Sequence, residues 1–331
     1  MSTEINNVLV TGGGGYVGSL LVPTLLEKGF RVKALDTFWY GRQFLAPHPN
    51  LQLVDMDIRE SQAVQAEMAG QDAVIHLACI SNDPSYDLNP ALGKSINYDS
   101  FQGLLEGASQ HHIQRFIYAS SSSIYGVKTE PEVREEARPE PLTDYSRYKL
   151  ACEQQLLEYP NPHAMVRTIL RPATLCGYAP RLRLDLTVNI LTIHALANRR
   201  IRVFGGDQLR PNLHIGDMVN AYLEFLAAPA AKIDGQAFNI GYQNRSVKDI
   251  AQIVRTTIGD DDIEIVFEPS DDQRSYHVNS DKVKAVLGFE PCFTIEDAVQ
   301  SLLTAWQHQR IQQPFGSMHH NIKRMQELNV Q

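Results

Sequence analysis

A glycine-rich turn between an apolar strand and a helix is the feature of this sequence that most constrains its fold. The run Asn7–Thr11 (NVLVT) predicts a buried strand, and the glycines after it follow the spacing G-x-x-G-x-x-G at Gly12, Gly15 and Gly18. Apolar residues at helical spacing then continue to Lys28. Glycine lets the backbone turn sharply and approach a phosphate without a Cβ in the way, and the helix N-terminus adds free N–H groups. The segment therefore predicts a turn that binds a pyrophosphate.

An acidic residue stands where a dinucleotide-binding fold needs one. Asp36 ends the second predicted strand, Phe30–Leu35, and lies 18 residues beyond Gly18. A carboxylate there accepts hydrogen bonds from the hydroxyls of an adenosine ribose and repels a 2′-phosphate, which favours NAD over NADP. A glycine-rich turn alone is a weak signal, and the acid at this distance makes it a specific one. Asp57 and Ile58, after the third predicted strand, either border the adenine or lie in an exposed loop.

The first half of the chain alternates short apolar strands with helical patterns. Further strands are predicted at Leu51–Val54, Ala73–Leu77 and Arg115–Ala119. Continuous apolar strands separated by helices indicate a parallel sheet covered on both faces, and right-handed crossovers then give a doubly wound, Rossmann-type α/β fold. Later strands and helices predict a smaller C-terminal α/β lobe: Ile201–Phe204, Ala237–Ile240, Val247–Thr257 and Ile295–His308.

These patterns divide the chain into three parts. We expect a Rossmann domain at residues 1–171, a substrate-binding lobe at 172–315 that interleaves with it, and a polar tail at 316–331 that is loosely ordered. The polar stretch Lys128–Thr143 predicts a loop rather than a disordered segment, because motif-bearing segments lie on both sides of it.

Charge and cysteine content narrow the class of protein. A formal net charge of −8 argues for solubility and against a nucleic-acid surface. The cysteines, at positions 79, 152, 176 and 292, include no CxxC pair and no zinc-like spacing with histidine. The polar start MSTEINN is unlike a signal peptide, and no apolar run reaches the ~18 residues of a membrane helix. We therefore expect a soluble cytoplasmic protein with reduced thiols, and no metal, membrane or nucleic acid as partner.

A tyrosine and a lysine share one face of a predicted helix. Tyr145 and Lys149 are four residues apart in a helix that opens at Thr143-Asp144 and continues to about Glu158. An ammonium near a phenol favours the phenolate and lowers its pKa from ~10 toward neutrality. Such a phenolate can take a proton from a hydroxyl while hydride leaves the same carbon for a nicotinamide. Taken alone, the pair also fits a tyrosine packed under a lysine stem, which is the commoner case.

A serine run supports a catalytic role for that pair. Ser120–Ser123 follows the fifth predicted strand directly and precedes Tyr125-Gly126. Hydroxyls at the carboxyl end of a central strand face the ligand crevice of a doubly wound sheet, where one of them can hydrogen-bond the reacting oxygen. A plain serine turn that leaves the strand is the alternative.

Together these motifs resemble the extended short-chain dehydrogenase/reductase family, and more narrowly its NAD-dependent nucleotide-sugar epimerases and dehydratases of the UDP-glucose 4-epimerase type. The resemblance covers about residues 6–305, through HLAC (76–79), RPATLCGY (171–178), FGGDQLRPNLHIGD (204–217), FNIG (238–241) and QRSYHVNSDKVKAVLGFEP (273–291). It implies Ser121, Tyr145 and Lys149 as the catalytic residues and NAD as the cofactor.

The resemblance also implies a set of cofactor contacts and an oligomeric state. The expected cofactor-binding residues are Gly12, Gly15, Tyr16, Val17, Gly18, Asp36, Asp57, Ile58, Leu77, Ala78, Asn97, Tyr145 and Lys149. Relatives commonly dimerise by pairing two helices from each subunit, here about Leu88–Ser109 and Asp144–Glu158, so we expect a homodimer.

The residues just before Tyr125 bear on the type of reaction. By the resemblance, the acting hydroxyl is Ser121, and the next two positions distinguish the subtypes. Sugar-nucleotide 4,6-dehydratases carry an Asp-Glu pair there, decarboxylating relatives keep a glutamate, and 3,5-epimerases use a cysteine, whereas this chain has Ser122 and Ser123. Because serine is a poor general acid or base near pH 7, elimination and carbon-acid chemistry are disfavoured.

Chemistry at a single carbinol carbon remains. Our first interpretation is a 4-epimerase, in which hydride leaves C4 of the sugar for NAD and returns to the other face of the ketone. The alternatives are a nucleotide-sugar 4-dehydrogenase or a 4-ketosugar reductase in surface-polysaccharide or deoxysugar biosynthesis, and a non-catalytic NAD-binding protein of the same fold.

The smaller lobe is expected to bind a nucleotide-diphosphate sugar of the UDP or GDP type. Arg210 and Arg274 fall where the family places the arginines of the diphosphate site, and a guanidinium suits two phosphate oxygens. Phe204 either stacks on the base or ends a strand in the core. The expected substrate-binding residues are Ser122, Ser123, Thr174, Asn189, Phe204, Arg210 and Arg274.

This lobe also departs from the family pattern. Thr174 stands where relatives often have an asparagine that contacts phosphate, and Arg181 and Arg183 occupy a loop that is usually rich in proline and asparagine. The two arginines either bind a nucleotide diphosphate, bind a carboxylated sugar or pair with Asp185. The base, the sugar and the role of these arginines stay open at the level of sequence.

Overall fold

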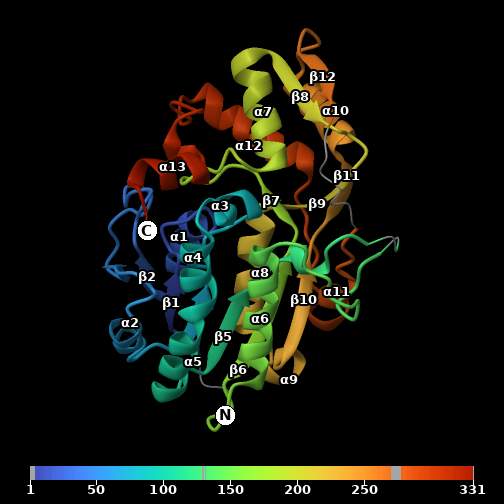
Figure 1. Cartoon of the computed structure of the whole chain (residues 1–331). Helices are drawn as coiled ribbons and strands as arrows, with labels where there is room; N and C mark the ends of the chain where they lie inside the picture. Colours follow the sequence, from blue (N-terminus) through green and yellow to red (C-terminus); the bar gives the residue numbers. More distant parts are fainter. Residues whose placement is uncertain (1–3, 129, 131, 270–276, 331) are drawn as a thin grey trace.

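A seven-stranded parallel sheet forms the centre of the molecule (Figure 1). The computed structural model describes residues 4–128, 130, 132–269 and 277–330. The strands of this sheet follow the order β10-β6-β5-β4-β1-β2-β3, and each neighbouring pair is parallel. Their bounds are β1 (Asn7–Thr11), β2 (Arg31–Asp36), β3 (Leu51–Asp55), β4 (Ala73–His76), β5 (Arg115–Ala119), β6 (Val166–Pro172) and β10 (Gln236–Ile240).

The central strands are buried on both faces. All four residues of β4 and the first four of β5 are buried, as expected for parallel strands that carry helices on either side. The strand order reverses direction at β1, which places the crevice of a doubly wound sheet at the carboxyl ends of β1 and β4. The predicted Rossmann-type fold class is confirmed.

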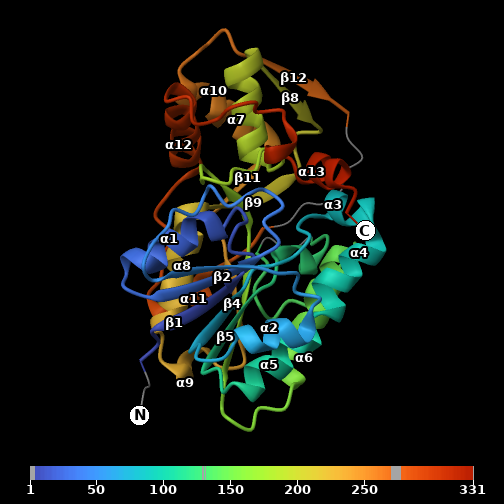
Figure 2. The same cartoon turned by 90° about the vertical axis from the view of Figure 1, so that its left-hand side faces the viewer.

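Helices cover both faces of this sheet (Figure 2). Helices α1 (Gly18–Glu27) and α8 (Ile215–Ala227) pack on one face, and α2 (Ser61–Glu67), α5 (Phe101–Gln110) and α6 (Asp144–Glu158) pack on the other. Short helical segments complete this part: α3 (Asp83–Leu88), α4 (Pro90–Lys94), a π-helix at Ser95–Asp99, a 3-10 turn at Ser122–Tyr125, α9 (Ala230–Ile233) and α11 (Asp281–Leu287). The apolar residues of α5 show the cause, since Phe101, Leu104 and Ala108 repeat at helical spacing and are all buried.

A smaller lobe lies beyond the carboxyl edge of the sheet. It contains a sheet of β7 (Thr174–Cys176), β9 (Leu209–His214) and β11 (Gln243–Ser246), and the parallel pair β8 (Arg200–Phe204) and β12 (Glu264–Glu268). Its core lies between α7 (Thr187–Asn198), α10 (Val247–Ile258) and α12 (Ile295–Gln307). Between β9 and β11 the chain returns to the main sheet, where it forms the edge strand β10. The chain therefore crosses between the two lobes more than once.

The C-terminal segment differs from its expectation of loose order. It forms a 3-10 turn at Ser317–His319 and helix α13 (Asn321–Leu328), which lies beside the first lobe (Figures 1 and 2). Asn321 and Met325 are buried, and the Arg324 Nε donates to the Trp39 carbonyl at 2.6 Å. Polar contacts with distant loops hold the helix, and such contacts leave no periodic apolar pattern in the sequence.

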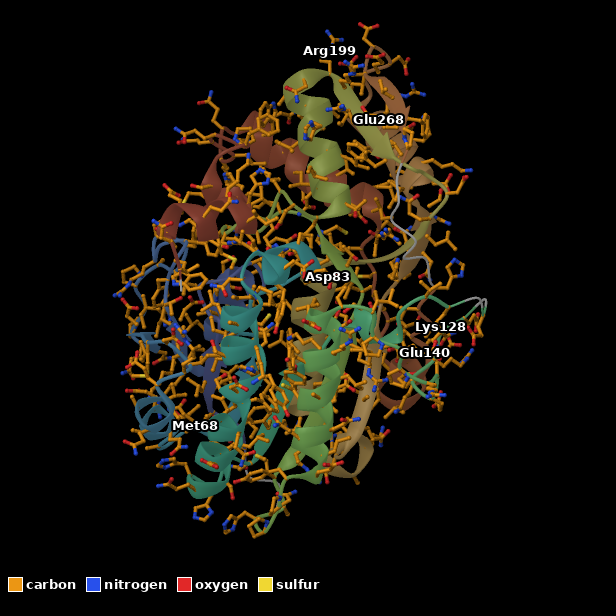
Figure 3. All side chains as sticks on the ribbon, viewed as in Figure 1. Met68, Asp83, Lys128, Glu140, Arg199 and Glu268 are labelled. Atoms are coloured by element: carbon orange, nitrogen blue, oxygen red, sulfur yellow. The ribbon has the colours of Figure 1, made fainter. Side chains whose placement is uncertain are left out.

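The stretch Lys128–Thr143 is a loop, as predicted, and specific contacts hold its described residues. The Lys128 ammonium lies 2.9 Å from the Glu140 carboxylate across the loop (Figure 3). The Val133 amide donates to the His277 carbonyl at 2.8 Å, which attaches the loop to the C-terminal half of the chain.

Three further features of the described residues bear on the class of protein: helix length, the state of the cysteines and possible metal ligands. None of the helices in the described ranges combines the length and the apolar character that a membrane crossing requires. The four cysteines are free thiols, and the described residues contain no group of three or more His, Cys, Asp or Glu side chains placed to hold a metal.

Candidate active site

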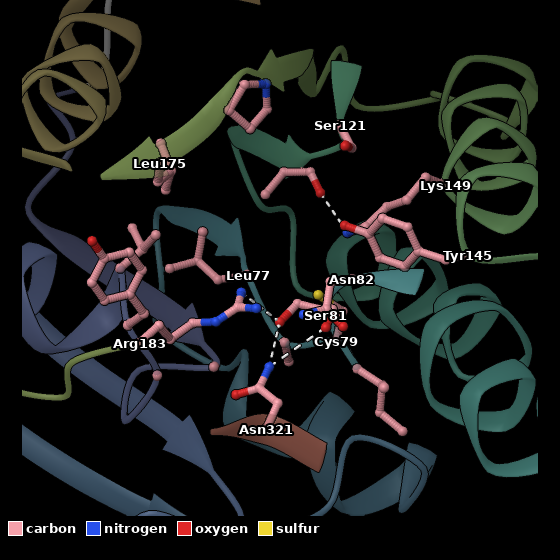
Figure 4. Close-up of a pocket in the computed structure, with 18 of the residues that line it drawn as sticks. Leu77, Cys79, Ser81, Asn82, Ser121, Tyr145, Lys149, Leu175, Arg183 and Asn321 are labelled. Atoms are coloured by element: carbon pink, nitrogen blue, oxygen red, sulfur yellow. Dashed lines mark hydrogen bonds between the residues drawn. The ribbon is translucent and has the colours of Figure 1, made fainter. Parts of the chain in front are cut away.

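A cavity of about 490 Å³ opens where the carboxyl ends of the central strands meet the smaller lobe. Figure 4 shows residues that line it, including Leu77 and Cys79 after β4, Ser121 after β5 and Tyr145 on α6. Sequence segments separated by more than a hundred residues therefore meet at one place, as the crevice of a doubly wound sheet predicts.

The glycine-rich turn between β1 and α1 forms one wall of the cavity. Gly12 has φ +75°, and its amide donates to the Leu35 carbonyl of β2 at 2.8 Å. A Cβ on Gly12 would lie 2.7 Å from the Ala78 nitrogen, and one on Gly18 would lie 2.4 Å from the Gly13 oxygen. Both positions exclude any side chain, which leaves backbone open to a phosphate.

Asp36 is held at the end of β2 by two backbone amides. Its Oδ2 accepts from the Gly14 amide at 3.0 Å, and its Oδ1 accepts from the Phe38 amide at 2.8 Å. Burial raises the pKa of Asp36, and these amides act in the opposite direction. The carboxylate lines the cavity with lone pairs still available, so the wall fits a dinucleotide whose ribose hydroxyls donate to it.

Most of the other expected cofactor residues also line the cavity. These are Gly15, Tyr16, Val17, Asp57, Ile58, Leu77 and Ala78. Asp57 is partly engaged, because it lies 2.7 Å from the Arg59 guanidinium. Asn97 has a supporting position: its side chain accepts from the Ile80 amide at 2.8 Å and donates to the Ile80 carbonyl at 2.9 Å. It thereby fixes the loop after β4.

Helix α6 presents the tyrosine and the lysine. It begins with a capping box, in which Thr143 Oγ1 accepts from the Ser146 amide at 3.3 Å and Ser146 Oγ accepts from the Thr143 amide at 3.1 Å. Tyr145 and Lys149 then face the cavity from successive turns, opposite Ser121 (Figure 4). The Lys149 ammonium is buried and donates to the Ala119 carbonyl at the end of β5 at 2.7 Å.

The acidity of Tyr145 differs from the expectation. Burial raises the pKa of the Tyr145 phenol, and although Arg183 and Ser121 lower it, burial prevails. The predicted shift toward neutrality by Lys149 is wrong for the protein alone, because the ammonium is directed at Ala119 and lies 5.9 Å from the centroid of the Tyr145 ring. A phenol in this environment keeps its proton unless further positive charge comes near.

A buried ion pair that sequence reasoning missed fixes α6 against the sheet. Glu153 on α6 accepts from Arg171 on β6 through both carboxylate oxygens, at 3.0 and 2.7 Å, and it also accepts from the Ser120 hydroxyl. Both side chains are less than a tenth exposed. No sequence signal joins these positions, since they lie on different elements.

The expected substrate-binding residues divide into two groups. Ser122, Ser123, Thr174 and Arg210 line the cavity. Asn189 is fully buried and its amide group bonds to the Gly177 amide at 2.9 Å and the Tyr16 hydroxyl at 3.1 Å. Phe204 is 52% exposed at the end of β8, and Arg274 lies outside the described residues.

Arg181 and Arg183, in the loop whose sequence departs from the family pattern, have different surroundings. Arg183 forms a bidentate pair with Asp185, at 2.9 and 3.1 Å, and its Nη1 donates to the Ser81 hydroxyl at 3.0 Å. Of the three possible roles for these arginines, pairing with Asp185 is the one found at Arg183. Arg181 also lines the cavity, but none of the described residues forms an ion pair with it.

Comparison with known proteins identifies what this arrangement resembles. Residues 8–241 match the profile of the NAD-dependent epimerase/dehydratase family. A UDP-glucose 4-epimerase of Halalkalibacterium halodurans is 27% identical over 305 residues, covering 86% of this chain and 90% of that protein. A dTDP-glucose 4,6-dehydratase of Streptomyces griseus is 27% identical over 315 residues, covering 91% and 94%.

The solved structures agree in fold over nearly the whole chain. The UDP-glucuronic acid 4-epimerase from Bacillus cereus, solved in complex with UDP-glucuronic acid and NAD, has a TM-score of 0.80 and 26% identity, covering 92% of this chain and 99% of its own. Relatives at similar identity thus include both epimerases and a dehydratase. The comparison therefore supports NAD as the cofactor but does not distinguish between these reactions.

Proposed function

The chain belongs to the NAD-dependent epimerase/dehydratase family, and on that premise we propose that it is a nucleotide-sugar 4-epimerase. Its cofactor is NAD, and members of this family use it to modify nucleotide sugars. The observation that carries the finer proposal is the pair Ser122 and Ser123, which line the cavity and occupy the positions before Tyr125 where an elimination needs a second acid and base.

The carboxylates near Tyr145 support this choice of reaction. Asp185 is bound by the Arg183 guanidinium, and Asp83 accepts from the Thr143 hydroxyl at 2.6 Å. Each of these carboxylates therefore has a structural partner within the protein. With serines at the two discriminating positions, the cavity favours a reaction that moves one proton and one hydride at a single carbon.

In the proposed reaction, Tyr145 is the residue that removes a proton from the sugar and returns it. NAD bound in the cavity would supply a reversible hydride acceptor for C4 of the sugar. Tyr145 takes the C4 hydroxyl proton as its phenolate and gives it back at the end, so the enzyme finishes each turnover in its starting state. Ser121 is the hydroxyl that orients the reacting oxygen, and the buried Lys149 ammonium lies 5.9 Å from the centroid of the Tyr145 ring.

The smaller lobe supplies the substrate side of the proposal. Arg210, on β9, lines the cavity and is the described cation that we assign to the diphosphate of a UDP- or GDP-type sugar, together with Arg274. The protein as a whole is acidic, with a net charge of −8, so these arginines provide local positive charge at the proposed substrate site. We assign this role to residues 172–315, and the main part of the cofactor site to residues 1–171.

The test begins with the freshly purified protein, which is denatured so that released nucleotide can be identified by chromatography. Near-stoichiometric NAD is expected. The holoenzyme is then incubated with a panel of UDP- and GDP-sugars without added cofactor, and products are identified by NMR. A pair of C4 epimers that interconvert supports the proposal. Turnover that consumes added NAD or NADPH in proportion to product would instead establish net redox chemistry.

We also propose a homodimer formed by the helices within Leu88–Ser109 and by α6. Leu88 is 41% exposed and Leu157 on α6 is 39% exposed, which supports an apolar contact there. Light scattering coupled to gel filtration should give twice the 37.1 kDa chain mass. A mass of one chain at micromolar concentration would contradict the proposal.

A further inference from the structure

Arg181 is a buried cation with few partners in the protein. The side chain is 2% exposed, yet it lines the cavity. Its Nη2 donates to Asn321 Oδ1 at 2.7 Å, and its guanidinium carbon lies 3.5 Å from the centroid of the Tyr40 ring. Its Nε has no hydrogen-bond partner among the described residues.

The charge of Arg181 lacks a bonded carboxylate. Asp36 and Asp185 are close enough to act on it electrostatically, but Asp36 accepts from two backbone amides and Asp185 is bound by Arg183. A buried charge without a bonded counter-ion is costly, and burial lowers the pKa of Arg181 to about 10. The surroundings therefore favour an anion from outside the protein.

The place of Arg181 indicates which anion this is. Its backbone amide donates to the Ser19 hydroxyl at 3.1 Å, so the residue packs on the first turn of α1, beside the glycine-rich turn. Asp36 lies on the same side of the cavity, whereas Arg210 enters from the smaller lobe. The guanidinium is thus on the side of the cofactor, where a dinucleotide carries its diphosphate.

The C-terminal helix α13 holds this guanidinium in place. Asn321, its first residue, accepts from Arg181 and from the Tyr40 hydroxyl at 2.9 Å, and donates to the Ser81 hydroxyl at 3.1 Å. Figure 4 shows Asn321 and Arg183 both converging on Ser81. One side chain thereby joins the loops after β2 and β4 to the loop after β7, and all three loops border the cavity.

We propose that Arg181 binds the diphosphate of NAD and that Asn321 positions it, so that the C-terminal segment is part of the cofactor site. Arg181 stacks on Tyr40 and donates to Asn321, and its Nε, which has no partner among the described residues, is the donor that we assign to a phosphate oxygen. The proposal rests on the cofactor and not on the reaction, so a failed epimerase assay would leave it intact.

The first test measures how fast the holoenzyme exchanges bound NAD for isotopically labelled NAD. Arg181→Met should speed this exchange about 10- to 100-fold, because one charge-assisted contact with the diphosphate is lost. Gln326→Ala, an exposed change on α13, is the control and should exchange like the wild type. An unchanged rate in Arg181→Met would overturn the proposal.

Competing ligands then locate the contact. In Arg181→Met the affinity for ADP-ribose should fall by a similar factor, while the affinity for adenosine, which has no diphosphate, should stay unchanged. An equal loss for adenosine would place Arg181 on the nucleoside. A loss confined to NADP would place it on a 2′-phosphate. Either of those results would overturn the assignment to the diphosphate.

The second test uses a variant that keeps the shape of α13. Asn321→Asp puts a carboxylate against Arg181, where it competes with the phosphate oxygens, so NAD exchange should again speed about tenfold or more. This variant also serves if Arg181→Met fails to fold. Asn321→Asp with wild-type exchange, and a circular dichroism spectrum showing an intact fold, would remove the C-terminal helix from the cofactor site.

Discussion

The Tyr145 hydroxyl faces a cavity in which burial raises its pKa, while Arg183 and Ser121 lower it. The protein alone therefore holds the phenol protonated at neutral pH. A phenolate requires additional positive charge nearby, which an oxidised nicotinamide carries. The Tyr145 phenol would consequently lose its proton most readily when the cofactor is bound in the form that accepts hydride, which would couple proton removal to the first half of the proposed reaction.

Removal of that hydroxyl should separate binding from chemistry. Tyr145→Phe is expected to keep its full content of NAD and to lose about 10²- to 10⁴-fold in kcat, because the general base is gone while the shape of the side chain is retained. Single-turnover assays with the nucleotide sugar, on protein whose bound NAD has been quantified, measure both quantities. Turnover close to that of the wild type would exclude Tyr145 as the base.

Asp36 should decide between the two dinucleotides. Asp36→Ala removes the carboxylate that repels a 2′-phosphate, so the ratio of the Kd for NADP to that for NAD should fall by about tenfold or more. Asp55→Ala is a matched control, since that carboxylate ends the neighbouring strand β3 but is exposed and pairs with Arg42. If both variants kept the wild-type ratio, Asp36 would have no role at the ribose.

His76 should make stability depend on pH. Burial, with a smaller effect of Lys149, lowers the pKa of His76 from 6.5 to about 3. The unfolded chain therefore binds a proton below pH 6.5 that the folded chain does not, so stability is lost as the pH falls from 6.5 toward 3. The loss at pH 5 amounts to about 2 kcal/mol.

Urea unfolding at pH 7 and pH 5 measures this effect. His76→Phe sacrifices the 2.7 Å contact with the Thr11 hydroxyl and is less stable at both pH values. The difference in unfolding free energy between the two pH values should nevertheless be about 2 kcal/mol smaller in the variant. An equal difference in both proteins would assign the acid sensitivity to other groups.

At the scale of elements, α6 is the part on which the site most depends. Its capping box sets where the helix begins, and the Glu153–Arg171 pair fixes its far half against β6. Removing one partner of a buried pair strands the other charge, so Glu153→Gln should lower the free energy of unfolding by about 3 to 5 kcal/mol. Chemical denaturation monitored by fluorescence measures this loss.

A double variant provides the control. Replacing both partners, as Glu153→Met with Arg171→Met, leaves no buried charge and should recover most of the lost stability. Because α6 carries Tyr145 and Lys149, a shift of this helix should impair turnover. Glu153→Gln is therefore expected to lower kcat more than it lowers the content of bound NAD. If the double variant were less stable than Glu153→Gln alone, the desolvation account of this pair would be wrong.

The elements also show what a sequence can and cannot predict. Strands and helices with strong apolar periodicity, such as β5 and α10, agree with expectation within a residue or two, because burial of a continuous stripe determines them. Helix α13 escaped prediction because Asn321 and Arg324 attach it through polar bonds to distant loops. The glycine turn and Asp36 were accessible because their spacing is local.

At the scale of the whole molecule, function depends on contacts between segments that are far apart in the chain. The cavity lies between a parallel sheet and a smaller lobe, and β10 ties the two by returning to the sheet edge. Ser121, Tyr145 and Arg210 meet there from three different elements. Sequence patterns named these residues and raised a pairing with Asp185, but they could not decide that Arg183 forms it or show that Asn189 is buried and bonded to backbone.

The central claim is that hydride leaves and re-enters the same carbon within one active site. The most direct measurement follows a nucleotide sugar deuterated at C4, chosen from the active members of the UDP- and GDP-sugar panel, by NMR and mass spectrometry through complete equilibration. The account predicts that both C4 epimers keep the deuterium at C4, with none in solvent or in added NAD. Deuterium that appears in reduced external cofactor, or that is replaced by solvent hydrogen, would contradict it.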